Sequence, residues 1–127
     1  MRSRTLRIIL AIVAGLGALD AFAGAWGLIG GGIVFAPDIA ALIPFPLWIP
    51  GVILGVAVGG TMLLACLAAT LNTRFTAELA VFAGAVSMGW ISVQVAMIGY
   101  VSWMQPAVFT HGLVALALGF ALRSTRE

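Results

Sequence analysis

The chain has very little charge. Only 8% of its 127 residues are Asp, Glu, Lys or Arg, whereas soluble domains carry charge on about 25% of their residues to keep the surface hydrated. Hydrophobic residues make up 63%, and the mean hydropathy is +1.20. This composition argues against a soluble enzyme, a nucleic-acid-binding protein and a disordered chain, because each depends on polar or basic residues. It indicates an integral membrane protein.

Lysine is absent, and cysteine and histidine occur once each, as Cys66 and His111. A single cysteine excludes an intramolecular disulfide, Cys-x-x-Cys redox chemistry and any multi-cysteine metal site. His111 lacks the further strong ligands that a metal site requires. No nucleophile stands beside a base at a readable spacing. The sequence therefore predicts no enzyme activity, no cofactor and no metal.

Four segments are long and apolar enough to cross a bilayer, whose hydrocarbon core of about 30 Å requires about 20 helical residues. They cover residues 7–33, 49–71, 77–101 and 105–122. A polar turn, residues 72–76, separates the second segment from the third, and Thr76 is the predicted N-cap of the third helix. We expect one all-α membrane domain, residues 1–127, folded as a four-transmembrane-helix bundle.

The connection between the first two segments, residues 35–51, contains four prolines. Proline removes a backbone donor and clashes with the preceding turn, so a continuous helix is excluded here. The connection is nevertheless apolar. We predict an outer loop that lies in the membrane interface and caps the bundle, with one helical turn at residues 37–43.

Arginine placement predicts the orientation. The six arginines precede the first segment, follow the fourth, or lie in the turn between the second and third, at positions 2, 4, 7, 74, 123 and 126. In a four-span topology these places share one side, and the opposite side carries no basic residue. The positive-inside rule then puts both termini in the cytoplasm.

The first 23 residues allow a second reading. They combine a basic start, an apolar stretch and the string Ala21-Phe22-Ala23, which is similar to a signal-peptidase site. Cleavage there would leave three spans. Asp20 interrupts this pattern, and the apolar run continues to Ile33, so we expect the segment to stay as the first span.

Small residues recur at a spacing of four, which lets membrane helices approach closely. We expect these stripes to form contacts within the chain, with a dimer interface as the alternative. They are Ala23, Gly27 and Gly31 in the first helix, Gly51, Gly55 and Gly59 in the second, and the pairs Ala80–Gly84 and Ala85–Gly89 in the third.

Three polar residues fall at a similar depth in the outer half of the bilayer. At about 1.5 Å per residue, Asp20 lies about 20 Å from Arg7, Gln94 lies about 24 Å from Glu78, and His111 lies about 8 Å inside the fourth segment. Ionisable groups at this depth are costly and face a partner or water. We predict a binding cluster of Asp20, Gln94 and His111, with the imidazole donating to the carboxylate. Four hydroxyl groups could join it from neighbouring turns: those of Thr61, Ser87, Ser92 and Thr110. The cluster would serve as a proton or solute relay, or as a structural knot that fixes helix register.

Two strings, residues 98–106 (IGYVSWMQP) and 49–54 (IPGVIL), resemble a family of small four-helix bacterial membrane proteins of the actinobacterial type. The resemblance covers most of the chain and implies the four-span fold. No activity is established for that family, so no catalytic or binding residue is carried over.

The function expected from these observations is a non-enzymatic one, a structural or interaction subunit of the membrane. The alternative is a small transporter or channel that uses the cluster of Asp20, Gln94 and His111. The expected partners are the lipid bilayer and either another membrane protein or further copies of the chain in a homo-oligomer. Nucleic acid is not an expected partner.

Overall fold

The computed structural model describes residues 2–100 and 102–125. This part of the chain is helical without a strand, and it contains four helical rods long and apolar enough to cross a membrane. The sequence-based prediction of an all-α chain with four such helices is confirmed. The helices are α1 (Arg2–Gly30), the short α2 (Pro37–Ala40), α3 (Trp48–Ile53), the π-helix η1 (Leu54–Gly59), α4 (Gly60–Leu71), α5 (Thr76–Ile98) and α6 (Met104–Ser124).

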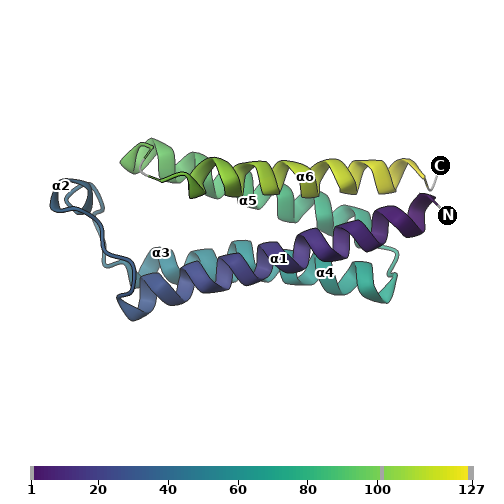
Figure 1. Cartoon of the computed structure of the whole chain (residues 1–127), viewed down its shortest axis with the longest axis horizontal. Helices are drawn as coiled ribbons and strands as arrows, with labels where there is room; N and C mark the ends of the chain where they lie inside the picture. The colour runs from purple at the N-terminus through teal and green to yellow at the C-terminus, as the bar shows by residue number, and fades with distance from the viewer. Residues whose placement is uncertain (1, 101, 126–127) are drawn as a thin grey trace.

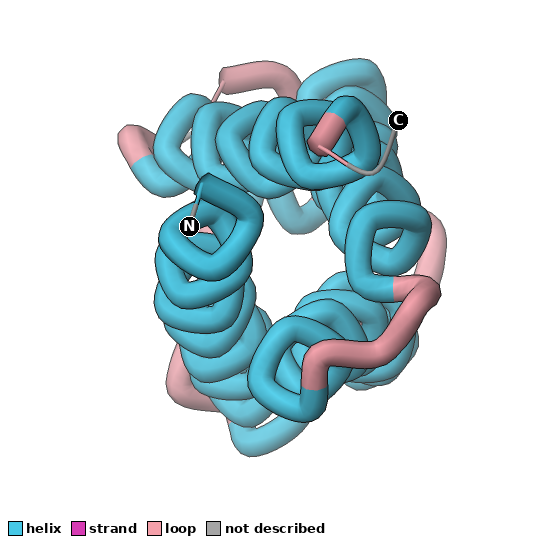
Figure 2. Tube along the Cα trace, turned by 90° about the vertical axis from the view of Figure 1, so that its right-hand side faces the viewer, coloured by secondary structure: helices cyan, strands magenta, loops and turns pink. Residues whose placement is uncertain are grey.

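Helices α3, η1 and α4 form one continuous rod, and the four rods run alternately up and down (Figure 1). The start of α1, the end of α6 and the α4–α5 turn lie at one end of the bundle, which we call the terminal end. Helix α2 and the α5–α6 turn lie at the other end, the loop end. Seen along the bundle, the rods surround a common axis (Figure 2). Helix α1 packs against α4 and α6, and α5 packs against α6 and α4.

Two helices end at glycines with a positive φ. Helix α1 ends at Gly30, because Gly31 adopts a φ of 79° that an α-helix cannot continue. The first helix is therefore shorter at its end than the predicted limit of residue 33. Helix α5 ends at Ile98, before Gly99 with a φ of 73°. The predicted limit at Val101 lies outside the described residues.

Hydrogen bonds close the terminal end of the bundle. Thr76 is the first residue of α5 rather than its N-cap. Its buried hydroxyl does not cap α5 but donates to the carbonyl oxygens of Ala68 at 2.9 Å and Thr73 at 2.7 Å. A guanidinium nitrogen of Arg7 donates to the carbonyl oxygen of Ala69 at 3.1 Å. Both side chains add donors to the last turns of α4, where the carbonyl oxygen of Ala68 also accepts from the backbone N–H of Thr73 at 3.1 Å.

The π-helix η1 was not predicted from the sequence. Such wide turns form i→i+5 hydrogen bonds and are frequent beside functional sites. The hydroxyl of Thr61 donates to the carbonyl oxygens of Ala57 at 2.6 Å and Val58 at 3.2 Å. These bonds satisfy carbonyl groups where the hydrogen-bonding pattern changes from π to α.

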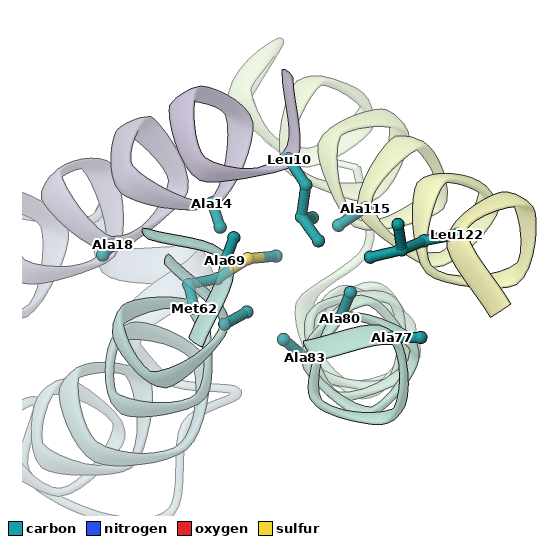
Figure 3. Close-up of a cluster of buried hydrophobic side chains, with 11 residues drawn as sticks. Leu10, Ala14, Ala18, Met62, Ala69, Ala77, Ala80, Ala83, Ala115 and Leu122 are labelled. Atoms are coloured by element: carbon teal, nitrogen blue, oxygen red, sulfur yellow. The ribbon is translucent and has the colours of Figure 1, made fainter. Parts of the chain in front are cut away.

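The buried core occupies the half of the bundle nearest the terminal end (Figure 3). It consists mainly of alanines, which allow the helices to approach closely and leave no room between them. The buried core residues are Leu10, Ala14, Ala18, Met62, Ala65, Ala69, Ala77, Ala80, Ala83, Ala115 and Leu122.

Helices α5 and α6 touch through glycines. A Cβ atom added to Gly112 would lie 2.9 Å from the carbonyl oxygen of Gly84, and one added to Gly119 would lie 2.9 Å from that of Ala77. Of the two predicted small-residue pairs in the third helix, Ala80–Gly84 is therefore buried in the bundle. Ala85 and Gly89 are exposed, so that pair forms no contact between helices.

Candidate functional site: a cavity toward the loop end

A cavity of about 180 Å³ lies between the rods where the alanine core ends, toward the loop end. We call it the loop-end cavity. All four rods contribute to its wall, because α1, η1, α4, α5 and α6 each present residues to it. Most of the wall is apolar. The polar side chains on it are Asp20, Ser87, Gln94, Ser102, Gln105 and His111.

The structure places Asp20, Gln94 and His111 on this one wall. Asp20 is exposed and lines the cavity from α1, so its carboxylate lies where the cavity opens. Within residues 2–100 and 102–125, the carboxylate forms no hydrogen bond or ion pair. The three residues thus share a cavity, but the predicted bond from imidazole to carboxylate is not formed.

His111 instead joins two helices. Its Nε2 atom lies 2.6 Å from the carbonyl oxygen of Val13. A carbonyl oxygen only accepts, so Nε2 carries the hydrogen and donates it. The close approach depends on Gly17, because a Cβ atom there would lie 2.6 Å from Nε2. In the neutral imidazole the other ring nitrogen, Nδ1, is an acceptor.

Gln94 is held by a second glutamine. The Nε2 group of Gln105 donates to Oε1 of Gln94 at 3.0 Å and to the carbonyl oxygen of Gly99 at 3.1 Å. The Oε1 atom of Gln105 accepts from the backbone N–H of Ser102 at 3.4 Å. Gln105 is only 3% exposed. It therefore braces the α5–α6 turn and fixes the position of Gln94 on the cavity wall.

Ser87 is the most buried polar residue of the wall, at 1% exposure. Its Oγ atom has no hydrogen-bond partner within the described part of the chain. An unpaired buried hydroxyl destabilises a fold by about 1–3 kcal/mol, and buried polar groups normally have partners. The hydroxyl therefore remains available to a molecule that enters the cavity.

A second cavity of about 280 Å³ adjoins the first beneath the proline-rich loop. The two share Leu28, Phe35, Trp90 and Gln94. The loop supplies Ile43, Phe45 and Leu47 to the second cavity, whose wall is almost entirely apolar. The apolar side chains of the loop thus form part of the wall of the second cavity.

Gln105 and Trp90 are site residues that were not predicted from the sequence, and Ser87 was expected there only as one of several hydroxyl groups that could join the cluster. Trp90 precedes Gln94 by four residues, a spacing that puts both on one helix face, so a signal was present. From the sequence, Gln105 is expected only to lie in the turn that leads into the fourth helix. The other hydroxyl groups near this depth do not join the site: Ser92 donates to Met88 within α5, and Thr110 is exposed.

The wall offers hydrogen-bonding groups and one carboxylate but no metal centre. Among the described residues, no three His, Cys, Asp or Glu side chains come together as metal ligands. Cys66 is a free thiol outside the cavity wall. The arrangement can bind and orient a small molecule with a polar head and an apolar body.

The chain was compared with protein-family models, with curated proteins and with solved structures, and none of them matches it. The resemblance to small four-span bacterial membrane proteins of the actinobacterial type stays a prediction.

Proposed function

We propose that this chain is a multi-pass protein of the bacterial inner membrane that binds a small organic solute in the loop-end cavity, as a small transporter does. The main observation in support is that Ser87 and Asp20 line one cavity and that neither side chain has a hydrogen-bond partner among the described residues. The proposal is non-enzymatic.

The free-energy cost of unpaired polar groups inside the membrane supports a bound ligand. A carboxylate within the membrane costs about 2.5–3.5 kcal/mol on insertion scales and normally faces a partner or water. An unpaired buried hydroxyl adds a further cost. A purely structural bundle would gain stability by replacing Asp20 and Ser87 with apolar residues. A solute that bonds to both groups offsets these costs.

The closed terminal half supports a transporter rather than an open channel. The alanine-rich core, which also contains Leu10 and Leu122, fills the bundle between the loop-end cavity and the terminal end. A channel requires a continuous path, whereas a transporter alternates between states that are open on one side. The loop-end cavity would be the binding site in one of these states.

The proposal includes the orientation of the chain in the membrane. The positive-inside rule favours the terminal end, with Arg4, Arg7, Arg74 and Arg123, in the cytoplasm. The cavity would then open to the outside. A Cys66→Ala chain with one new cysteine at Asp38 should react with a membrane-impermeant maleimide in intact spheroplasts, and one at Ser3 should not. The reverse labelling would contradict this orientation.

Binding is tested with three probes that share one apolar skeleton: 4-phenylbutylamine, 4-phenylbutanol and 4-phenylbutanoate. The full chain in lipid nanodiscs should bind at least one of them by calorimetry. Ser87→Leu should abolish that binding, because the larger side chain fills the cavity. Ser92→Leu is the matched control on the exposed face of the same helix and should bind normally. Absence of binding for all three probes would contradict the proposal.

A structural or interaction subunit is the second candidate. The bond from His111 to Val13 favours it, because this polar residue fastens α1 to α6. Its partner would be another membrane protein or a second copy of the chain. Cross-linking in native membranes, followed by identification of a stoichiometric partner, would support this candidate if none of the three probes binds.

A further inference from the structure

We infer that the solute is a lipophilic amine, with its ammonium group at Asp20 and its apolar body reaching into the second cavity. This inference rests on the proposed function and specifies the chemical class of the ligand. Three observations support it: the charge of Asp20, the hydrogen-bond acceptors of the wall, and the residues that the two cavities share.

Charge complementarity selects a cation. Asp20 is the one formally charged side chain among the described residues that line either cavity. The nearest arginine along α1 is Arg7, about 20 Å away at the rise of an α-helix, and it lines a separate cavity at the terminal end. With no cation of the protein beside it, the carboxylate attracts a cationic ligand and repels an acidic one.

Acceptors surround the same space. An ammonium group donates up to three hydrogen bonds and accepts none. The wall includes Asp20, Ser87 and His111. Oγ of Ser87 has no partner among the described residues, and His111 already donates its Nε2 hydrogen to Val13, which leaves Nδ1 as the acceptor of the neutral ring. An ammonium group can donate to each of these side chains, whereas Asp20 repels a carboxylate head.

The two cavities accommodate the rest of the molecule. The loop-end cavity alone, at about 180 Å³, exceeds the roughly 150 Å³ of an apolar cavity that holds benzene. Trp90 and Phe35 lie on the wall of both cavities. An aryl or alkyl body at this junction would contact aromatic rings and remain near enough for the ammonium group to reach Asp20.

Sugars and metal ions fit poorly. A sugar needs many hydrogen-bonding partners around its whole surface, but the wall of the second cavity is nearly all apolar, with Gln94 as its polar side chain. A metal ion needs three or more strong ligands, and the described residues offer no such group.

The decisive comparison uses the unmodified chain in nanodiscs. We expect 4-phenylbutylamine to bind at least about tenfold more tightly than 4-phenylbutanol, which corresponds to about 1.4 kcal/mol. Asp20→Asn should remove most of this difference by weakening amine binding, while alcohol binding stays within about twofold. Asp38→Asn changes a carboxylate of the exposed loop and should alter neither affinity.

The outcomes separate this inference from the proposed function. Equal binding of amine and alcohol, or tighter binding of 4-phenylbutanoate, would overturn the amine while leaving the cavity as a solute site. Absence of binding for all three probes would overturn both. The comparison in the unmodified chain does not depend on the folding of a variant. Asp20→Glu, which keeps the charge, should retain the preference for the amine.

Discussion

The imidazole Nε2 of His111 donates a hydrogen bond of 2.6 Å to the carbonyl oxygen of Val13, although 98 residues separate the two in the sequence. This bond joins α6 to α1 where the alanine core gives way to the loop-end cavity. The only histidine of the chain therefore joins α6 to α1 at the wall of the loop-end cavity.

The bond from His111 to Val13 predicts a strict requirement for glycine at position 17. Gly17→Ala would place a methyl group against the imidazole and displace it. We expect a lower melting temperature in detergent, with a loss of up to about 1.7 kcal/mol, since hydrogen bonds between membrane helices average about 0.6 kcal/mol and reach about 1.7. Gly30→Ala is the control, because a Cβ there meets nothing within 4 Å. Equal melting temperatures for the two variants would contradict the role of Gly17.

Gly84 and Gly89 lie on the same helix and should respond differently to the same substitution. A Cβ at Gly84 would meet the backbone of Gly112 and Leu116, which cannot move aside, whereas one at Gly89 meets nothing within 4 Å. Gly84→Ala should therefore destabilise the chain by about 1–3 kcal/mol, as overpacking does. Gly89→Ala should be neutral or slightly stabilising, because alanine favours helix. Thermal denaturation of both variants checks this ranking.

Gln105 should matter more for the loop end than Gln94. Gln105→Leu removes donors to Gln94 and Gly99 and an acceptor for Ser102. We expect faster amide hydrogen exchange around Gly99 and a loss of about 1–3 kcal/mol in unfolding free energy. Gln94→Leu removes one of these partners and should have the smaller effect. The opposite order would show that Gln105 does not brace the turn.

Two threonines provide a matched pair at the terminal end. Thr76→Val removes the hydroxyl that donates to the carbonyl oxygens of Ala68 and Thr73, while both oxygens keep a backbone donor, so we expect a loss of about 0.5–1.5 kcal/mol. Thr70→Val removes an exposed hydroxyl that donates to Cys66 within α4 and should change stability by less than about 0.5 kcal/mol. Chemical denaturation in detergent distinguishes these outcomes.

Hydropathy predicted the four rods because each is a long apolar run, and this property needs no knowledge of neighbours. Their faces were harder to predict. On α5, Gly84 packs against α6 while Gly89 is exposed, although both follow an alanine by four residues. Nearly every face of a membrane helix is apolar, so the pattern does not reveal which face meets protein and which meets lipid.

The depth of the site residues in the bilayer could be predicted from the sequence, but their hydrogen-bond partners could not. Counting helical rise put Asp20, Gln94 and His111 at one level, and they line one cavity. Depth does not include rotation about the helix axis or the direction of a side chain. For this reason the counting gave neither the bond from His111 to Val13 nor the unpaired hydroxyl of Ser87.

The π-helical turn η1 makes the second span tolerant of a change in its length. An i→i+5 turn holds one residue more than an α-helical turn, and the exposed Val56 lies within it. Deleting Val56 would return the segment to α-helix and keep Gly51 and Met62 on their buried faces. A deletion within α5 would instead rotate all later residues of that helix by about 100°. The second span thus holds, beside the cavity, one residue more than a continuous α-helix would need.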